Sequence, residues 1–440
     1  MYKSKDRKTK PLFEEFLPFG GQLDEKNRWL KVGDLIPWEE LEDSYASYFS
    51  DIGRPGLDGR LVVGLLLLKH MTDLGDEELV ASFYENPYWQ YFCGLEEFKK
   101  KGVLDPSSLS RLRKRLGPKY FKELEDKTYQ VLIERKLLKA RGMQSDGTVF
   151  PSNVKYPNDV GLLNDVRKWL VDKIKKIGKQ IGKSYRTYCR VAQKAYFGFS
   201  KKRKKTRKAI DRARRQMIQY VRRNIGQLKN AIEGVKAVGK EVKACVIEKL
   251  QVSEQIFRQQ LEMYRNKTHR VKDRIVSFCR PYVRPIKRGK SGKEVEFGPK
   301  ASLSHVDGFL FLDKLDHDNF SEADTRVVKD QIESYERRFG KKPPNFIADK
   351  LYGSRENREL LNNLGIRAAF SPLGRKKRVS GADRWFKQKQ RERNRIEGNI
   401  GNGKAHYSLD RILYKGKAGA EMWVRGGILG MNLKIALKRM

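Results

Sequence analysis

The chain has 440 residues, of which 95 are Lys or Arg and 54 are Asp or Glu, so its formal net charge is +41. Because 39% of the residues are hydrophobic, the chain can bury a core, and its length allows two or three domains. The high positive charge predicts a polyanionic partner, since release of counterions from phosphates favours binding by Lys and Arg. Nucleic acid fits better than a membrane, because the longest apolar run, residues 61–68, is too short to span a bilayer.

The cysteines and the N-terminal residues argue against zinc-binding, redox and secreted proteins. The four cysteines lie far apart in the sequence and form no CxxC pair, which excludes zinc and redox motifs and favours free thiols in a reducing cytosol. The first ten residues are basic but are not followed by the apolar segment of a signal peptide. We therefore expect a cytoplasmic protein.

Residues 1–138 are expected to form an all-α domain. Pro37 in a first turn followed by Glu39 and Glu40 indicates a helix start. Residues 57–71 are apolar nearly all round and predict a buried helix. Residues 75–84 predict another helix, which Asn86-Pro87 ends, and an aromatic segment follows at residues 88–92.

A basic helix closes this region. Asp105-Pro106 is a strong helix-start signal, and Gly117-Pro118 separates this helix from the next one at residues 120–136. Helix, turn and basic helix is the pattern of a helix-turn-helix DNA reader, although a solvated charged face would have the same composition. The side chains that would contact DNA are Arg111, Arg113, Lys114 and Arg115.

Residues 160–270 are helical and very basic. Apolar residues recur at steps of three and four, as at Met217, Tyr220 and Val221. The region is either an exposed helical hairpin with charged outer faces or an arm that contacts phosphates. Its densest charged run supplies the candidate DNA contacts Lys201, Lys202, Arg203, Lys204 and Lys205.

Strand signals dominate after residue 270. Short β-prone segments lie at residues 275–278, 295–297 and 301–304, and residues 309–312 should close a hairpin around Asp307-Gly308. An amphipathic helix at 324–339, a strand at 346–348, a helix at 357–364 and a strand at 366–370 follow. Strands that alternate with helices predict a mixed α/β domain over residues 139–440.

Three acids stand out by their position. Asp146 is flanked by small residues in the middle of a predicted strand, and Asp349 closes another strand, where α/β sheets form their crevices. Glu397 would share one helix face with Arg393 and Lys404, at about 100° per residue. Such a face is also typical of an ordinary salt-bridge cluster.

Nucleic-acid chemistry explains this set of residue types. Cleavage of a phosphodiester places negative charge on the attacking and leaving oxygens, and two divalent ions held by carboxylates stabilise both oxygens. Magnesium prefers oxygen ligands and keeps several waters, so two or three carboxylates suffice. A neighbouring Arg and Lys would hold the flanking phosphates.

At these residues the chain resembles the DDE transposases of bacterial insertion sequences, in the broad IS-four/IS-five group. In the N-terminal part, the matching segments are Gly53-Arg54-Pro55 with the Leu-rich helix and Asn86-Pro87-Tyr88-Trp89. The segments around Asp146, Ala348-Asp349-Lys350 and Arg393 to Lys404 resemble the catalytic regions. Family members often show Tyr, Arg, Glu and Lys in the last region. Arg393, Glu397 and Lys404 match, but Gln390 stands at the Tyr position.

The resemblance implies an RNase H-like mixed-sheet catalytic domain, with Asp146 on the first strand, Asp349 after the fourth and Glu397 on a later helix. The acids would bind two Mg²⁺ ions per site, with Mn²⁺ as a substitute. Because 203 residues separate Asp146 from Asp349, the basic helices at 160–270 would be an insertion within the catalytic domain.

The resemblance also implies the activity. The protein would cut double-stranded DNA at the terminal inverted repeats of a mobile element and join the ends to target DNA, as a homodimer on DNA and associated with the bacterial nucleoid. A non-catalytic DNA-binding protein derived from a transposase and a structure-selective nuclease are the alternatives.

Overall fold

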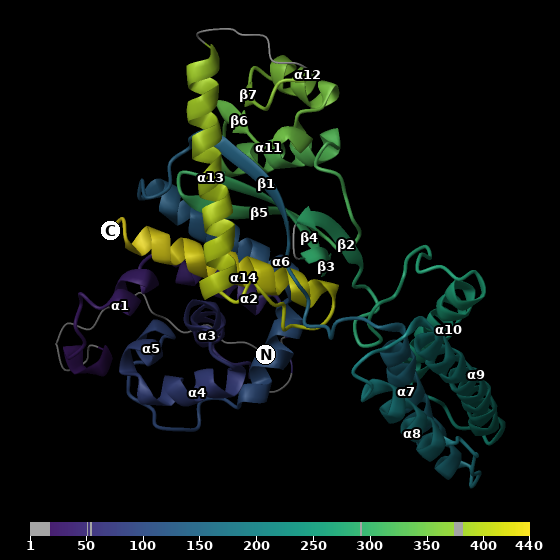
Figure 1. Ribbon diagram of the computed structural model, residues 1–440. Helices are drawn as coiled ribbons and strands as arrows, with labels where there is room; N and C mark the ends of the chain where they lie inside the picture. Colours follow the sequence, from purple (N-terminus) through teal and green to yellow (C-terminus); the bar gives the residue numbers. More distant parts are fainter. Residues whose placement is uncertain (1–17, 51, 53–54, 291–292, 374–381) are drawn as a thin grey trace. The chain divides into compact units, whose positions relative to one another are not determined.

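The computed structural model describes residues 18–50, 52, 55–290, 293–373 and 382–440 (Figure 1). The chain divides into two compact units. Unit 1 comprises the chain up to Ser152 and from Pro299 onward, and unit 2 comprises Asn153–Gly298. Gly53 and Arg54, which belong to the N-terminal resemblance, lie outside the described residues.

Unit 1 begins with short helices whose starts follow local capping chemistry. Side chains of Asn27, Asp58, Asn86 and Asp105 accept hydrogen bonds from backbone N–H groups in the first turns of the helices that they precede. The predicted buried helix and the helices on either side of it are all present. The elements are η2 (Pro18–Gly21), α1 (Arg28–Gly33), α2 (Trp38–Ala46), α3 (Gly59–Thr72), α4 (Asp76–Glu85), α5 (Pro87–Phe92) and α6 (Pro106–Glu134).

Helix α6 is kinked where the sequence predicts a break. Gly117 has φ 67° and ψ −177°, a backbone conformation that favours glycine, and Pro118 follows it. The predicted pair of helices is therefore present, as the two parts of α6 on either side of this kink, and the basic side chains lie before it.

A five-stranded mixed sheet forms the other half of unit 1, in the order β5-β4-β1-β6-β7. Strand β1 pairs antiparallel with β4 and parallel with β6, and β6 pairs parallel with β7. The predicted hairpin around Asp307 and Gly308 joins β4 to β5, and both turn residues have positive φ. The strands are β1 (Met143–Val149), β4 (Lys300–Val306), β5 (Phe309–Asp316), β6 (Asn345–Ile347) and β7 (Arg367–Ala369).

The two faces of β1 pack against different helices, because successive side chains of a strand point to opposite faces. On one face, the Ser145 hydroxyl donates to Gln331 of α11 (Thr325–Phe339) over 2.8 Å. On the other face, Asp146 and Thr148 lie beneath the long helix α13 (Ala382–His406), which crosses the sheet in Figure 1. The remaining elements of this half are η3 (Lys350–Tyr352), α12 (Arg355–Asn363) and α14 (Lys417–Leu437).

One hydrophobic core runs through both halves of unit 1. It joins the helices α1 to α6 with side chains of β1, β4, β5, β6 and the last helix α14. A buried ion pair between Arg425 of α14 and Glu125 of α6 reinforces this contact. The expected boundary between residues 1–138 and 139–440 falls within this shared core, and the division remains a prediction.

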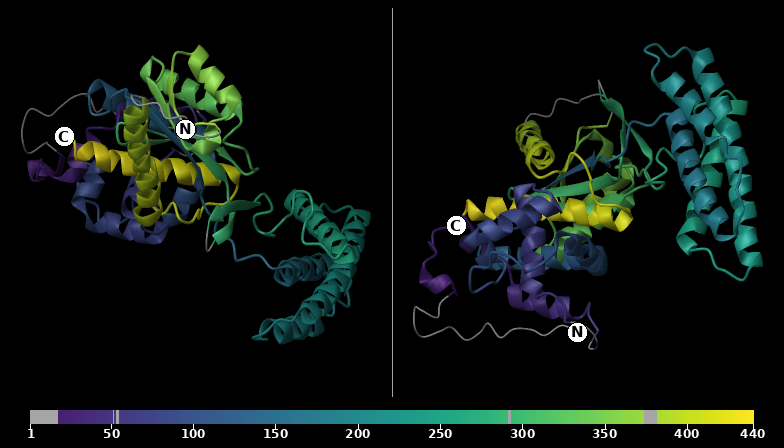
Figure 2. Two further views of the ribbon diagram at one scale, coloured as in Figure 1. Left: turned by 45° about the horizontal axis from the view of Figure 1, so that its top comes forward. Right: turned by 90° about the horizontal axis from the view of Figure 1, so that it is seen from below.

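Unit 2 is a bundle of helices with its own core, and Figure 2 shows this bundle from two further sides. The helices are α7 (Asp159–Gln180), α8 (Cys189–Ser200), α9 (Arg207–Ala237) and α10 (Ala244–Arg265), followed by a hairpin of β2 (Pro285–Lys290) and β3 (Lys293–Phe297). The strand predicted at residues 275–278 is wrong. Ile275 and Phe278 instead pack as irregular chain into the helical core.

Unit 2 also concentrates the charge of the chain. Its sequence holds 40 Lys and Arg against 12 Asp and Glu, a net charge of +28. Separately, none of the helices within the described ranges is long and apolar enough to cross a membrane.

The contact between α3 and α14 yields a stability prediction. A Cβ on Gly426 would clash with the buried His70 ring, so Gly426→Ala should destabilise unit 1 by about 1–3 kcal/mol. Thermal and denaturant unfolding would measure the loss. Gly401→Ala on α13 is the matched control, because nothing lies within 4 Å of its added Cβ. Equal stability of the Gly426→Ala variant and the wild type would contradict this packing.

Candidate active site

The predicted acids lie on three different elements. Asp146 lies at the centre of β1, where it is partly buried, and its carboxylate accepts the Gly147 N–H at 2.8 Å. Asp349 follows β6 and accepts the Leu351 N–H at 2.6 Å, which fixes its carboxylate at the end of the strand. Glu397 lies in the middle of α13, with about half of its side chain exposed.

Helix α13 is anchored over the sheet at several points. Ile396 and Ile400 are buried in the core beneath it. The Gln390 amide donates to the backbone carbonyl of Ala369 at 2.7 Å, and the Lys404 ammonium donates to that of Val149 at 2.9 Å. These contacts hold α13 across β1, so Glu397 lies over this strand.

Burial and the neighbouring charged groups shift the pKa of Asp146. The pKa of Asp146 is raised to about 6, mainly by burial, and the negative charges of Asp349 and Glu397 contribute in the same direction. The Gly147 N–H and the Arg393 guanidinium act in the opposite direction and lower this pKa. Asp349 and Glu397, which are distant from Asp146 along the chain, therefore both contribute to its electrostatic environment.

Glu397 is engaged by a cation on its own helix. Arg393 Nη1 lies 2.9 Å from Glu397 Oε1, the i,i+4 pair that the spacing predicts. Across the described ranges, no three His, Cys, Asp or Glu side chains are grouped so that they could hold a metal ion. The chemistry of the donors still fits a divalent cation, because carboxylate oxygens are its preferred ligands and a cation would relieve the repulsion on Asp146.

Gln390 has a structural role at the position where relatives often carry Tyr. Besides Ala369, its amide nitrogen lies 3.3 Å from the carbonyl of Ala348, the residue before Asp349. Gln390 thus joins α13 to the ends of β6 and β7, next to one of the acids.

The basic residues predicted to contact DNA fall into two groups. In unit 1, Arg111, Lys114 and Arg115 are exposed on α6. Arg113 is buried, forms an ion pair with Asp76 at 3.1 Å and stacks over Tyr414. Because this side chain is engaged inside unit 1, we leave Arg113 out of the proposed DNA contacts.

The basic run of unit 2 is fully accessible. Its residues form the loop between α8 and α9, and all five side chains are exposed: Lys201, Lys202, Arg203, Lys204 and Lys205. Their one-signed charge in an exposed loop is suited to contacts with phosphates.

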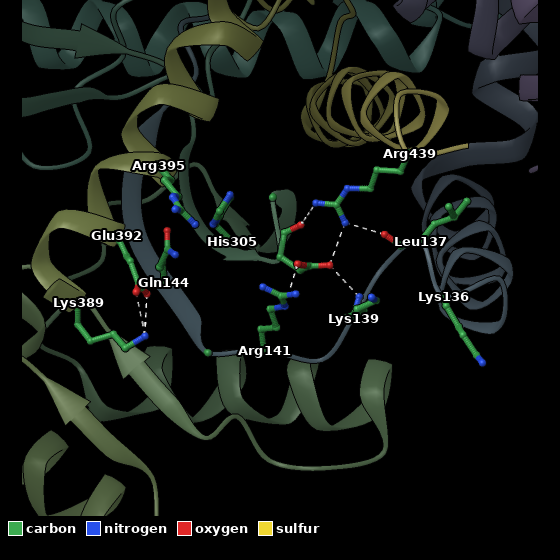
Figure 3. A pocket seen from close by; sticks show the side chains of 13 residues that line it. Lys136, Leu137, Lys139, Arg141, Gln144, His305, Lys389, Glu392, Arg395 and Arg439 are labelled. Carbon is green, nitrogen blue, oxygen red and sulfur yellow. Dashed lines mark hydrogen bonds and ion pairs between the residues drawn. The ribbon is translucent and has the colours of Figure 1, made fainter. Parts of the chain in front are cut away.

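Sequence reasoning missed a basic pocket beside α13, which Figure 3 shows from close by. Gln144 and His305 lie at its floor. Arg395 points into the pocket from α13, and Arg439, which follows the end of α14, points into it from the other side. The pairing of Gln144 with His305 across β1 and β4 is a long-range contact that carries no local signal. Only the cluster of charge around Arg395 could have suggested it.

Comparison with known proteins finds two family matches. Residues 18–115 match a family described as a transposase domain, and residues 346–434 match one described as a transposase DDE domain. The chain is also 32% identical over 166 residues to the uncharacterized protein ORF8 in the nfe locus of Rhizobium meliloti, which covers 37% of this chain and 80% of that protein. No solved structure gives a significant match.

These matches define a protein that acts on DNA and has a transposase function. The chain belongs to the DDE-type insertion-sequence transposases. The second match covers Asp349 and Glu397 as well as Arg393 and Lys404.

The geometry of the acids predicts how Asp146 titrates. Asp349→Asn removes a neighbouring negative charge and should lower the pKa of Asp146 from about 6, whereas Arg393→Gln removes a positive charge and should raise it. Carbon NMR of carboxyl-labelled Asp, without metal, would measure both shifts. An Asp146 pKa that is the same in both variants and in the wild type would mean that these groups are not neighbours.

Proposed function

We propose that this transposase cuts DNA at the ends of a mobile element and joins the free 3′-hydroxyl ends to target DNA, with Asp146, Asp349 and Glu397 as the catalytic residues. The observation that carries the proposal is the anchoring of α13 across the sheet, which brings Glu397 close enough to Asp146 to shift its pKa.

The topology supports an RNase H-like catalytic domain. The central β1 has an antiparallel neighbour on one side and parallel strands on the other, and β6 is the fourth strand of this sheet in chain order. Asp146 and Asp349 therefore lie on adjacent parallel strands, and the third acid comes from a helix that covers the same face.

DDE transposase domains generally use divalent metal ions. The ligands would be Asp146, Asp349 and Glu397, and we propose two Mg²⁺ ions, which Mn²⁺ could replace. When bound, such ions activate water or a 3′-hydroxyl and stabilise the charge that develops on the phosphate. For Glu397 to serve as a ligand, its carboxylate has to exchange its contact with Arg393 for the metal.

We propose that the cations of α13 contact DNA phosphates. Arg393 and Lys404 lie on the same face of the helix as Glu397, so both cations would face phosphates on either side of the scissile bond. Arg393 would be free for this contact if Glu397 held a metal ion. Lys404 would make it in addition to its hydrogen bonds with Thr148 and Val149.

DNA binding would involve both units. Arg111, Lys114 and Arg115 would contact the terminal inverted repeats from α6, and the basic loop at residues 201–205 would hold DNA phosphates without sequence preference. Because two ends have to be held together, we propose a homodimer on DNA, acting at the nucleoid in the bacterial cytoplasm.

One observation favours a second possibility, a DNA-binding protein without catalytic activity. In the part of the chain that the structure describes, the acids do not form a closed ligand cluster, and Glu397 is paired with Arg393. Strand cleavage with Mg²⁺ or Mn²⁺ on the ends of the element separates the two functions, because only the catalytic protein cuts.

Neutral substitutions of the acids test the catalytic assignment. Asp146→Asn, Asp349→Asn and Glu397→Gln should each lower cleavage of a duplex with a terminal inverted repeat by roughly 10³-fold or more, because each removes a negatively charged metal ligand. DNA affinity should be preserved, since none of these residues is a cation. Gel analysis of the cut strand and fluorescence anisotropy of binding measure the two effects.

The control for this experiment is Asp330→Asn, which removes an exposed acid from α11. It should leave cleavage unchanged. A rise in melting temperature with Mg²⁺ in the wild type, absent in Asp146→Asn, would report metal binding independently of activity. Full cleavage by any of the three acid variants would refute its assignment.

The basic loop of unit 2 gives a further prediction. Replacing Lys201, Lys202, Lys204 and Lys205 by Gln should lower the slope of log affinity against log salt by about 2–4, because each lost phosphate contact removes about 0.9. The same four positions changed to Arg keep the charge and should keep the slope. A Gln variant with the wild-type slope would show that this loop does not contact DNA.

A further inference from the structure

The pocket beside α13 is separate from the acids. It has a volume of about 710 Å³, which lies within the range of ligand-binding pockets. Its lining comes from the loop after α6, the start of β1, the end of β4 and the β4–β5 turn, α13, and Arg439.

Helix α13 separates the pocket from the catalytic acids. The face of α13 that packs on the sheet carries Ile396, Ile400 and Gly403. At about 100° per residue, Arg393, Glu397 and Lys404 lie roughly 70° to one side of this face. By the same rule, Glu392, Arg395 and Asn399 lie roughly 70° to the other side. Glu392 and Arg395 line the pocket, and Asn399 donates to the Gly308 carbonyl at its edge.

The rim of the pocket carries an excess of positive charge. Its acids, Asp307 and Glu392, are both paired: Glu392 with Lys389 at 2.8 Å, and Asp307 with Arg141 at 3.2 Å and Arg439 at 2.9 Å. Within the described ranges, the remaining three cations of the lining have no ion-pair partner. They are Lys136, Lys139 and Arg395, and all three side chains are exposed.

The floor of the pocket offers neutral hydrogen-bonding groups. Gln144 and His305 are directly paired residues of β1 and β4, so their side chains share one face of the sheet. They are 5% and 2% exposed, and Gln144 Oε1 and His305 Nδ1 have no hydrogen-bond partner among the described residues. Buried polar atoms are nearly always satisfied, which points to a ligand with hydrogen-bonding oxygens or nitrogens.

His305 stays neutral in this setting. Burial and the nearby Arg395 and Arg439 lower the pKa of His305 to about 4. With its proton on Nδ1, a neutral imidazole can donate a hydrogen bond to an anionic oxygen, while Gln144 Oε1 can only accept one from an N–H or O–H donor of the ligand. The cations of the rim supply the charge opposite to a phosphate. The combination suits a phosphate ester and disfavours a cationic ligand.

We propose that this pocket is a second DNA-binding site, which holds the phosphates of a DNA segment on the flank of α13 opposite the catalytic acids. The inference rests on the proposed function only in that the protein handles DNA. A strand bound at the acids lies on the other side of the helix, so the pocket contacts a different stretch of the backbone. DNA in the pocket would bind to the same helix that carries Glu397.

The test removes two unpaired cations from the rim. Arg395→Gln with Lys139→Gln should weaken binding of a 30-base-pair duplex and lower the salt slope by about 2, because two phosphate contacts are lost. The matched control is Arg326→Gln with Lys329→Gln, which removes one Arg and one Lys from exposed positions of α11 on the opposite face of the sheet. Fluorescence anisotropy in EDTA at several salt concentrations measures both.

A second rim variant and a titration with a nucleotide complete the test. A second variant, Lys136→Gln with Lys139→Gln, leaves α13 unchanged and should show the same loss of slope. Calorimetry with dATP tests the other source of phosphate. Binding of dATP that is lost in the rim variants, with DNA affinity unchanged, would identify a free nucleotide as the ligand and overturn the proposal.

The proposal is also overturned if the rim variants keep the wild-type slope, or if the α11 control loses as much as they do. Binding in EDTA does not require the acids to cut DNA. Failure of cleavage by the wild type would therefore count against the proposed catalysis and leave this site unaffected.

Discussion

The candidate site depends on one packing constraint, the position of α13 across the central sheet. Ile396 and Ile400 fix the height of the helix over the strands, and Gln390 and Lys404 tie it to backbone carbonyls of β7 and β1. With these contacts, Glu397 lies over β1, the strand that carries Asp146. The electrostatic effect of Glu397 on Asp146 is thus a consequence of apolar packing and of two polar anchors, and the positive charge of Arg393 opposes it.

The same helix divides the surface of unit 1 into two regions. Both of its flanks carry cations, but only one of them contains the acids. A continuous core supports this arrangement, because α14 connects the sheet to α3 and α6. The acids and the basic pocket therefore lie on either side of one well-supported helix.

Local signals predicted much of this structure. Asp105-Pro106 predicts the start of α6, Asp307-Gly308 predicts the hairpin, and Asp349 is predicted at a strand end. Contacts between distant segments leave no such local signal. The sequence does not reveal that Arg113 pairs with Asp76, or that the apolar run from Ile275 to Phe278 packs among helices instead of forming a strand. The pocket at Gln144 and His305 depends on strand register, which composition does not specify.

The most direct test of the central claim is to locate the metal. A crystal structure of the protein with Mn²⁺, read by anomalous scattering, would show where the ion binds. Our account predicts a peak in contact with Asp146 and Asp349, with the Glu397 carboxylate turned from Arg393 towards it. A peak elsewhere in the protein, with Asp146 and Asp349 lacking metal and Glu397 still paired with Arg393, would contradict it.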